Sequence, residues 1–478
     1  MTLRRTKIVA TLGPATDDPA MLERLLKAGT DVVRLNFSHG AEKVQARIEA
    51  VRQCAKKLGV PVGIMGDLQG PKIRISRFQK GKVLLEKGAQ FILDASLPVT
   101  GGTDVSVGID YKELPQDVAP NDTLLLDDGR IVLIVKKVEG TRVICQVEAG
   151  GELSNNKGIN RLGGGLTAAA LTEKDKEDLL VAVAANVDYL AVSFPRDAKD
   201  IDEARKLLTA AGSKAGIIAK IERAEAVTNI DEIIIASDGI MVARGDLAVE
   251  IGEAEVPAAQ KHMIRRARAL DRPVITATQM MESMIQSPVP TRAEVSDVAN
   301  AVLDHTDAVM TSAETAVGAH PDKVIETMSR VCIAAEKQEE TKTSRHRMEL
   351  QFQRVDEAIA MATLYTANRL GIKAIVALTE SGATPLMMSR IRTGIPIYAL
   401  SRNPLSLGKM TLYRDVYPVY FDPTQVDEEK VISVAVGLLK QENIVAEDDL
   451  IIFTKGDKSG EHGGTNSMKI IHVDDHHA

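Results

Sequence analysis

Short runs of branched apolar residues alternate with longer amphipathic stretches along most of the chain. Each run ends in a polar residue or a glycine and is followed by a helical pattern, which is typical of parallel strands joined by helices. Eight such runs lie before about residue 340: KIVATLG from Lys7, VVRLNF from Val32, VGIMGDL from Val62, YLAVSF from Tyr189, GIIAKIE from Gly216, GIMVARGD from Gly239, PVITATQM from Pro273 and AVMTSAE from Ala308. Eight βα units predict a closed α/β barrel, a (β/α)8 TIM barrel, with functional groups where the strands end.

Two parts of the chain depart from this rhythm. Between Leu68 and about Leu166 the helical periodicity is missing, and β-branched runs such as TLLLDDGRIVLIVKKV surround an Asp-Asp-Gly turn signal. We interpret this segment as a β-rich cap domain inserted in the third βα loop, either a lid that excludes water or an inert decoration. After about Glu340, the charged stretch KQEETKTSRHRMELQ is typical of a solvated helix or linker.

A smaller α/β pattern follows this linker. Its strand candidates begin at Ala374, Pro396, Val416, Leu450 and Met468, which predicts a C-terminal α/β domain with a mostly parallel sheet. The expected domains are therefore a barrel made of residues 1–67 and 167–340, a cap of residues 68–166, and a C-terminal regulatory domain of residues 341–478.

Composition and charge exclude several classes of protein. The 478 residues are 44% hydrophobic and 26% charged, and the net charge of −7 provides no basic surface for nucleic acid. The three cysteines have neither the spacing of a disulfide framework nor that of a zinc site, which favours a reducing compartment. No stretch approaches the length of a membrane span, and the first residues lack the apolar core of a signal peptide. We expect a cytoplasmic protein that meets anionic substrates through a local positive site.

Polar residues gather at the predicted carboxyl ends of the barrel strands. They are Asn36, Ser38, Asp67, Ser193, Lys220, Glu222, Asp246, Thr278, Ser312 and Glu314. In IIAKIERAEAV, Lys220 and Glu222 are two positions apart and share a strand face. If the barrel closes, they meet Asp246, and two carboxylates beside a lysine suit a hard divalent ion and a migrating phosphoryl group. The alternative is a buried ion pair that only fixes the barrel.

Two neighbouring segments carry cations suited to phosphate. In VVRLNFSHG, Arg34, Asn36 and Ser38 share one face, and the planar fork of an arginine fits a phosphate group. Exposed polar strand residues are the alternative. In GDLQGPKIR, Lys72 and Arg74 follow a Gly-Pro turn where the insertion leaves the barrel, and they can reach a second phosphate-bearing substrate.

Two later segments could bind the part of the substrate that lies away from its phosphate group. ARGDLAVE places Gly245 and Asp246 at a helix start, where free backbone amides attract a carboxylate, although a plain N-cap aspartate explains the pattern as well. In TATQ, Thr276 and Thr278 share a strand face, so that either hydroxyl could line the pocket.

These segments belong to a series of blocks that resembles pyruvate kinase: VVRLNFSHG, GDLQGPKIR, LTEKDKEDL, SFPR, IIAKIE, GIMVARGDL, TATQMMESM, PTRAEVSDVANAVLD and TSAETAVGAHP. The similarity runs in order from Arg5 into the C-terminal domain. It implies the three-domain architecture that the pattern suggests. It also implies transfer of the phosphoryl group of phosphoenolpyruvate to ADP, and protonation of the enolate to give pyruvate, alongside ATP. Mg²⁺ or Mn²⁺ would be the cofactor, and a second magnesium would arrive with ADP.

The resemblance further implies roles for single residues. Lys220 resembles the lysine that stabilises the phosphoryl group in flight, Arg34 the phosphoryl-binding arginine, and Glu222 and Asp246 the metal ligands. The amides of Gly245 and Asp246 would hold the substrate carboxylate. Thr278 resembles the threonine near the carbon that takes the proton, which would arrive through Ser312 and water. The groups similar to those near the nucleotide phosphates are Asn36, His39, Arg74 and Lys157 of NNKGIN.

Two departures from better-known members change what is expected. Many members hold potassium with groups that resemble Asn36, Ser38, Asp67 and the carbonyl of Leu68, and they carry a glutamate at the place of Lys72. DLQGPK resembles the branch that works without potassium, since a fixed ammonium can supply the missing charge. The second departure is NRLGGGLTAAALTEKD, a longer and more glycine-rich return from the cap, for which a wider or looser lid motion is possible.

The C-terminal domain carries a further resemblance. ALTESGATP, with Thr379, Ser381, Gly382 and Thr384, is similar to the loop that binds an effector phosphate, although an unused loop is the alternative. Family members are usually homotetramers, with a phosphorylated metabolite as allosteric activator. Two rival functions stay open: a metal-dependent, enolate-forming lyase or aldolase on the same barrel, and an inactive metabolite sensor.

Overall fold

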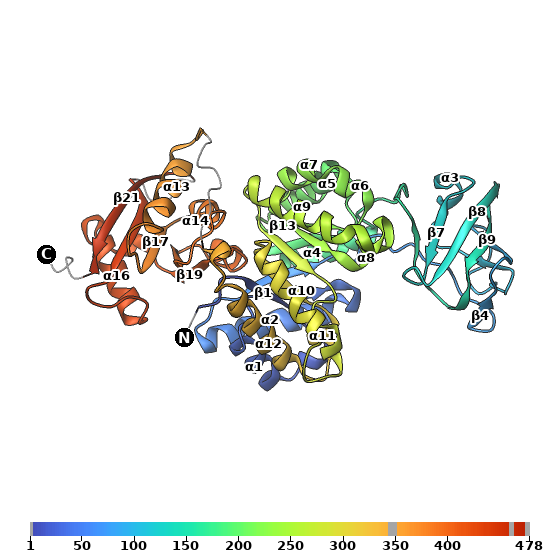
Figure 1. Cartoon of the computed structure of the whole chain (residues 1–478), viewed down its shortest axis with the longest axis horizontal. Helices are drawn as coiled ribbons and strands as arrows, with labels where there is room; N and C mark the ends of the chain where they lie inside the picture. The colour runs from blue at the N-terminus through green and yellow to red at the C-terminus, as the bar shows by residue number, and fades with distance from the viewer. Residues whose placement is uncertain (1–2, 343–350, 458–462, 474–478) are drawn as a thin grey trace.

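The computed structural model describes residues 3–342, 351–457 and 463–473. Its three parts follow one another along the longest axis of the molecule (Figure 1). The barrel lies in the middle, the β-rich cap projects from one end, and the C-terminal α/β domain packs against the other. The cap and the C-terminal domain therefore meet opposite ends of the barrel.

The middle part is a closed barrel of eight parallel strands, as the sequence predicted. Its strands are β1 (Lys7–Thr11), β2 (Val32–Asn36), β3 (Gly63–Asp67), β12 (Tyr189–Val192), β13 (Gly216–Ile221), β14 (Gly239–Ala243), β15 (Val274–Ala277) and β16 (Ala308–Thr311). Each begins at the predicted residue or one residue later. Side chains alternate along them: Ile217 and Ala219 of β13 pack outward against helices, whereas Ile218 packs inside the barrel.

Helices surround this barrel. They are α1 (Pro19–Lys27), α2 (Ala41–Leu58), α4 (Glu173–Ala184), α5 (Ala198–Ala210), α6 (Ala224–Thr228), α7 (Ile230–Ala236), α8 (Arg244–Ile251), α9 (Val256–Ala269), α10 (Arg292–Leu303), α11 (Ala313–Ala316) and α12 (Pro321–Ala335). Local sequence sets several of their ends. The capping box of Thr172 and Asp175 begins α4, and Gly59, with φ 68°, ends α2 in the left-handed conformation that glycine adopts easily.

The β-rich cap lies between β3 and α4, which confirms the predicted insertion in the third βα loop. Its elements are β4 (Lys82–Leu85), β5 (Gln90–Asp94), β6 (Ser106–Gly108), α3 (Leu114–Asp117), β7 (Thr123–Leu126), β8 (Ile131–Glu139), β9 (Arg142–Ala149), β10 (Gly151–Ser154) and β11 (Ile159–Arg161). Strands β7 and β8 form an antiparallel hairpin. Its turn contains Asp127, Asp128 and Gly129, all at positive φ, so the Asp-Asp-Gly signal marks the turn it predicted.

The C-terminal domain has a five-stranded sheet in the order β19-β18-β17-β20-β21, and only β21 runs antiparallel to its neighbour. The strands are β17 (Ala374–Leu378), β18 (Ile397–Ser401), β19 (Val416–Tyr420), β20 (Leu450–Gly456) and β21 (Thr465–His472), and the helices are α13 (Val355–Ala367), α14 (Ala383–Ser389), α15 (Pro404–Met410) and α16 (Val431–Gln441). The predicted, mostly parallel sheet is confirmed. Among the described residues, no helix is long and apolar enough to cross a membrane.

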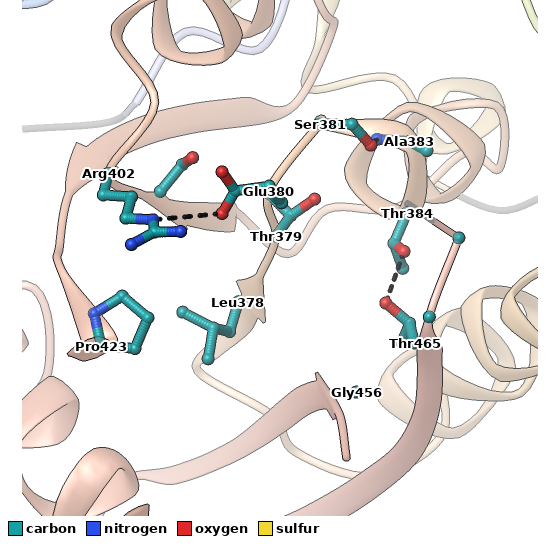
Figure 2. A pocket seen from close by; sticks show the side chains of 13 residues that line it. Leu378, Thr379, Glu380, Ser381, Ala383, Thr384, Arg402, Pro423, Gly456 and Thr465 are labelled. Carbon is teal, nitrogen blue, oxygen red and sulfur yellow. Dashed lines mark hydrogen bonds and ion pairs between the residues drawn. The ribbon is translucent and has the colours of Figure 1, made fainter. Parts of the chain in front are cut away.

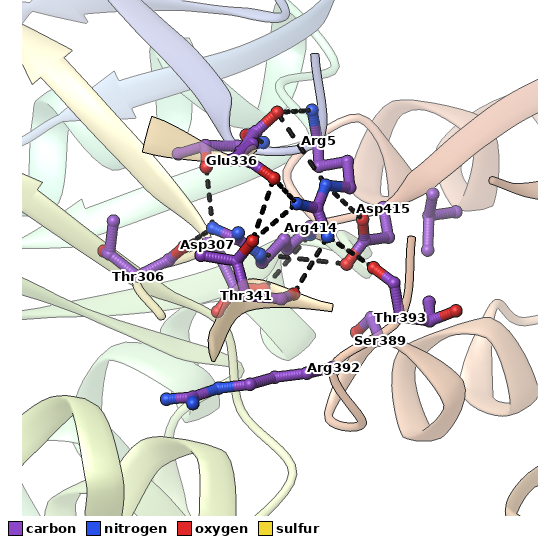
Figure 3. A network of polar contacts seen from close by, with 12 residues as sticks. Arg5, Thr306, Asp307, Glu336, Thr341, Ser389, Arg392, Thr393, Arg414 and Asp415 are labelled. Atoms are coloured by element: carbon purple, nitrogen blue, oxygen red, sulfur yellow. Dashed lines mark hydrogen bonds and ion pairs between the residues drawn. The ribbon is translucent and has the colours of Figure 1, made fainter. Parts of the chain in front are cut away.

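Apolar and ionic contacts join the C-terminal domain to the barrel. Ile218 and Met241 from inside the barrel belong to the same buried cluster as Met387 of α14. Beside this cluster, Asp307 accepts hydrogen bonds from the guanidinium of Arg390 (NH1 to Oδ2, 3.0 Å) and from the backbone amide of Arg414 (3.1 Å), within a buried polar network (Figure 3). The end of the barrel that carries the strand N-termini is therefore sealed, and the opposite end is left for the cap.

Candidate active site

The carboxyl ends of the barrel strands bring together the charged residues that the sequence singled out. Arg34, Asp67 and Lys220 each stand two positions after an apolar residue that packs inside the barrel, and Glu222 stands four positions after one. The alternation of strand side chains therefore turns all four toward the barrel axis.

The ammonium of Lys220 is at the centre of this group. It lies 3.0 Å from Oε1 of Glu222 and 3.4 Å from Oδ1 of Asp67. It also donates a 2.7 Å hydrogen bond to Oγ of Ser193, which in turn donates to the carbonyl of Leu68 (2.7 Å). Burial disfavours the charged ammonium, but the Asp67 and Glu222 carboxylates outweigh it and raise the pKa of Lys220. Lys220 is therefore a fixed positive charge at neutral pH.

A second cation stands beside it. Nε of Arg34 donates to Oδ2 of Asp67 (2.5 Å), and its NH1 donates to the hydroxyl of Thr11 (3.0 Å). Burial opposes ionisation of Asp67, but the Arg34 guanidinium and the Lys220 ammonium outweigh it and hold the pKa of Asp67 below its usual value. Asp67 therefore keeps its negative charge and fixes both cations.

Glu222 and Asp246 are the two carboxylates expected to bind metal, and they lie in one electrostatic environment. Burial raises the pKa of Glu222 to about 7, with Lys220 opposing and Asp246 adding to the shift. Burial also raises the pKa of Asp246, against the pull of Lys220. No group of three His, Cys, Asp or Glu side chains suited to a metal occurs among the described residues. Two acids fit a hard ion that completes its coordination with water and phosphate oxygens.

The loop after β15 corrects one expectation about the threonines. Thr276 and Thr278 do not share a face, because β15 ends at Ala277 and Thr278 adopts a left-handed conformation with φ 68°. Thr276 faces outward and donates to the hydroxyl of Thr306 (3.0 Å). Oγ1 of Thr278 instead accepts from the amide of Gly245 (2.9 Å) and donates to the carbonyl of Ala277 (2.7 Å). A left-handed β-branched residue is rare and is typical of a functional site.

The loop after β16 contains Ser312, and its backbone is held by a neighbouring acid. The amide of Ser312 donates to Oε2 of Glu314 (2.6 Å), and Oε1 of Glu314 accepts from the amide of Met281 in the loop after β15 (3.3 Å). The loops that carry Thr278 and Ser312 are thus joined through one buried carboxylate.

The groups expected near a nucleotide lie where the cap meets the barrel. Lys72, Arg74 and Lys157 line a cavity of about 250 Å³ together with Asp246. Nζ of Lys157 pairs with Oδ1 of Asp127 from the β7–β8 turn (2.7 Å). The side chain of His39 lies outside the described part of the structure, although its backbone belongs to a short helical turn after β2.

The groups that resemble a potassium site are also near one another, but they already have partners. Oδ1 of Asn36 accepts a hydrogen bond from the amide of Ser38 (2.9 Å), and the Leu68 carbonyl accepts one from the Ser193 hydroxyl. Partial burial, and after it the Arg74 guanidinium, lowers the pKa of Lys72, whereas Asp246 raises it. The charge of Lys72 thus acts on the acids expected to bind metal.

A separate pocket lies in the C-terminal domain, where the sequence placed an effector loop (Figure 2). The hydroxyl of Thr379 accepts from the amide of Gly382 (3.0 Å), and Ser381 accepts from the amide of Ala383 (3.4 Å). Thr384 is buried and bonds the hydroxyl of Thr465 (2.7 Å). The pocket also contains a cation that sequence reasoning did not single out, Arg402, paired with Glu380 at 3.5 Å.

Sequence reasoning missed Thr11 and Arg244 at the barrel mouth, and it noted Ser193 without giving it a role. Thr11 orients Arg34, and Ser193 orients Lys220. Arg244 donates to the carbonyl of Thr278 (2.7 Å) and pairs with Asp297 (2.7 Å), so it holds the loop after β15. Arg244 could have been found from the sequence, because it is a basic residue directly before Gly245. Nothing in the local pattern marks Thr11, because its partners lie on other strands.

A parallel barrel that gathers two cations and three carboxylates at its mouth suits phosphoryl transfer, the reaction class of a phosphotransferase. The family model described as pyruvate kinase, barrel domain, matches residues 3–325, and the one described as pyruvate kinase, alpha/beta domain, matches residues 357–471. The chain therefore belongs to the pyruvate kinase family.

Known members are similar to the chain over nearly their whole length. Pyruvate kinase II of Salmonella typhimurium is 56% identical over 477 residues, which cover 99% of each chain. A pyruvate kinase of Haemophilus influenzae is 55% identical, with 95% and 96% covered. The crystal structure of a pyruvate kinase from Cryptosporidium parvum superposes with a TM-score of 0.92 at 34% identity, covering 98% of this chain and 96% of that one.

This membership confirms the predicted reaction. The enzyme transfers the phosphoryl group of phosphoenolpyruvate to ADP, and its family depends in general on a metal ion. Neither the lyase nor the inactive sensor agrees with a relationship of this extent.

Proposed function

We propose that the residues at the barrel mouth divide the pyruvate kinase reaction among them as the resemblance suggests. The observation that supports this most directly is the Lys220 ammonium, held between Glu222, Asp67 and Ser193 beside the Arg34 guanidinium. Two cations fixed by a common carboxylate form a rigid positive surface. Such a surface stabilises the charge of a phosphoryl group in flight without rearranging during the reaction.

Glu222 and Asp246 are proposed to hold Mg²⁺ or Mn²⁺. Their raised pKa values are consistent with this role, because a divalent cation between them replaces the proton that each acid otherwise tends to keep. When bound, the ion supplies positive charge to the phosphoryl oxygens and orients the substrate. Lys220 and Arg34 hold the same oxygens from the protein side.

The other end of phosphoenolpyruvate is proposed to bind at the start of α8. The amides of Gly245 and Asp246 would donate to its carboxylate, and the amide of Gly245 exchanges its present acceptor, Thr278, for the substrate. The Thr278 hydroxyl, freed in this way, would stand near the carbon that takes the proton, with Ser312 in the neighbouring loop. The cap groups Arg74 and Lys157, together with Asn36 and His39, would approach the phosphates of ADP.

Replacing Lys220 tests the central assignment. Lys220→Met keeps most of the length of the side chain and removes its charge, and Glu222 can take up a proton because its pKa is about 7. We expect phosphoryl transfer to fall by roughly three orders of magnitude, the scale seen when a charge-stabilising group is lost. Pyruvate and ATP are measured with phosphoenolpyruvate, ADP and magnesium, and circular dichroism checks folding. Lys323→Met on exposed α12 is the control, and near-normal turnover of Lys220→Met would exclude Lys220 from the mechanism.

Potassium independence is a second proposal about the same mouth. The Lys72 ammonium interacts with Asp246, Glu222 and Lys220, a place where a fixed charge supplies what a free cation supplies in other members. Full activity is expected in potassium-free buffer, and Lys72→Glu should create a requirement for potassium. A strong requirement in the unaltered enzyme would refute the proposal.

The C-terminal pocket is proposed to bind the phosphate of an activating metabolite, through the hydroxyls of Thr379 and Ser381 and the cation Arg402. Ser381→Asp places a negative charge where the phosphate would lie. It should abolish activation by sugar phosphates or nucleoside monophosphates at low phosphoenolpyruvate, with basal activity unchanged, whereas Ser433→Asp at a half-buried position of α16 should not. Activation that survives Ser381→Asp would place the effector elsewhere.

Assembly and location complete the proposal. A homotetramer in the cytoplasm follows from the family resemblance. Light scattering should give a mass about four times the 51.5 kDa of one chain. A monomer at micromolar concentration would contradict it.

A further inference from the structure

Glu314 is a buried acid between two loops of the barrel mouth, and none of the assignments above uses it. Its side chain is almost inaccessible, at 2% exposure. It lies in the short helix α11, directly after Ser312 and Ala313. Its two oxygens serve two different loops: Oε2 accepts from the amide of Ser312 at 2.6 Å, and Oε1 accepts from the amide of Met281 at 3.3 Å.

The loop after β15 has an unfavourable backbone just before the point that Glu314 holds. Three residues before Met281, Thr278 has φ 68°, and Gln279 after it has φ 55°. A left-handed conformation of a residue other than glycine persists only where the surroundings enforce it.

We infer that Glu314 is a positioning residue, whose carboxylate fixes the Thr278 loop and the Ser312 loop relative to each other. A charged acceptor forms stronger hydrogen bonds to amides than a neutral one, and a carboxylate has an oxygen for each loop. The importance of this link for the reaction rests on the roles proposed for Thr278 and Ser312. The link itself rests only on the contacts.

The same helix offers a matched control. Thr315, next to Glu314, is also buried and donates to the carbonyl of Thr11 (2.8 Å), which ties α11 to β1 rather than to the loop after β15. Thr315→Val removes that hydrogen bond and the one between the Thr315 and Thr311 hydroxyls (2.9 Å), with little change of shape. Glu314→Gln also keeps its shape, but it has a single acceptor oxygen, so its amide group must face one of the two N–H donors. Both variants lose a buried hydrogen bond, but only Glu314→Gln loses the connection between the Thr278 loop and the Ser312 loop.

The first measurement is hydrogen exchange at the amides of Ser312 and Met281 in the full-length enzyme. Glu314→Gln should speed the exchange of at least one of them by 10-fold or more, whereas Thr315→Val should leave both near the wild-type rate. Unchanged protection of both amides in Glu314→Gln would overturn the inference, whatever the activity.

The second measurement separates proton transfer from phosphoryl transfer. Exchange of the methyl protons of pyruvate with deuterated water, followed by NMR with magnesium and inorganic phosphate, reports proton transfer alone. Glu314→Gln should slow this exchange at least 10-fold more than Thr315→Val does, at a comparable loss of thermal stability. Equal slowing of methyl exchange in the two variants would show that Glu314 has only a structural role.

Two further variants distinguish the possible failures. If Thr278→Ala and Ser312→Ala both leave methyl exchange unchanged, the roles proposed for these residues fail, and amide exchange still decides whether Glu314 holds the loops. If they slow methyl exchange and Glu314→Gln does not, the proposed roles stand and the inference about Glu314 is wrong.

Discussion

The pKa of a buried acid in this enzyme depends on how far neighbouring cations offset the cost of burial, as two aspartates of the barrel show. Asp67 has both Arg34 and Lys220 beside it, and its pKa is held below the usual value. Asp188 is about as buried and accepts from the amide of Ile64 (2.8 Å), with no cation in contact among the described residues, and burial raises its pKa to about 6. The same chemical group is therefore a fixed anion at the catalytic end of the barrel and a weak acid at the opposite end.

Asp188 should make stability depend on pH. Its folded pKa of about 6 lies above the ordinary value of 3.8, so the folded state binds its proton more tightly than the unfolded state does. The resulting penalty is absent below about pH 4 and grows to about 3 kcal/mol above about pH 6. Asp188→Asn can still accept from the Ile64 amide, and we expect it to raise the thermal midpoint more at pH 7.5 than at pH 5. Equal gains at both values, or the same behaviour of Asp427→Asn on the surface, would contradict this.

At the scale of elements, the two connections to the cap are tied to the barrel. Asp175 in the first turn of α4 accepts from the amide of Gly70 in the outgoing connection (3.0 Å). Arg223 donates to the carbonyl of Leu166 (3.0 Å) and Arg196 to that of Thr167 (2.9 Å) in the returning one. The longer, glycine-rich return from the cap is therefore held near its middle, directly after its three glycines. The extent of cap motion stays a prediction.

Gly70 lies where the connection to the cap contacts Ser193, the hydrogen-bond partner of Lys220. It has φ 69°, and a Cβ there would lie 2.7 Å from Cβ of Ser193, whose hydroxyl holds Lys220. Gly70→Ala should therefore displace Ser193 and reduce kcat by roughly 10- to 100-fold, as small displacements of catalytic groups do. Steady-state kinetics measure the effect.

The control for this variant is Gly81→Ala. Gly81 has φ 78° and open space around its Cβ position, so alanine there carries only the backbone strain of about 1 kcal/mol. A Gly70→Ala enzyme with the kcat of Gly81→Ala would show that Ser193 tolerates the contact.

At the scale of the whole molecule, a buried ion pair fixes the C-terminal domain on the barrel. The side chains of Asp307 and Arg390 are 2% and 1% exposed, and Asp307 also accepts from the backbone amides of Arg414 and Val274. One aspartate thus receives hydrogen bonds from both domains. The C-terminal pocket and the barrel mouth lie on either side of this contact.

Removing the charge of Asp307 should be costly. Asp307→Asn leaves the Arg390 guanidinium buried without its anion, which costs roughly 3–5 kcal/mol in comparable pairs. We expect a lower thermal midpoint and faster amide exchange in α14. Glu326→Gln is the control, because its 2.9 Å pair with Lys323 is exposed and such pairs contribute at most about 1 kcal/mol. Equal midpoints for the two variants would mean that the Asp307 pair does not hold the interface.

Much of this molecule could be predicted from its amino-acid sequence, and the misses have a common cause. The positions of Lys220 and Arg34 follow from period-two alternation, which depends only on neighbouring residues. The predicted shared face of Thr276 and Thr278 was wrong because alternation holds only within a strand, and Thr278 lies beyond the end of β15 at Ala277. Thr11 was missed because its partner Arg34 stands on another strand.

The sequence by itself determined the eight strands, the cap hairpin, the mostly parallel C-terminal sheet and the side of each strand that carries charge. These depend on local periodicity and on turn residues, which act over a few positions. Tertiary structure alone decided which charges meet: Asp67 with both Arg34 and Lys220, Glu314 with two loops, and Asp307 with the second domain. The closure of the barrel and the packing of the domains bring these groups together across long stretches of chain, and those contacts set the pKa values and the geometry on which the chemistry depends.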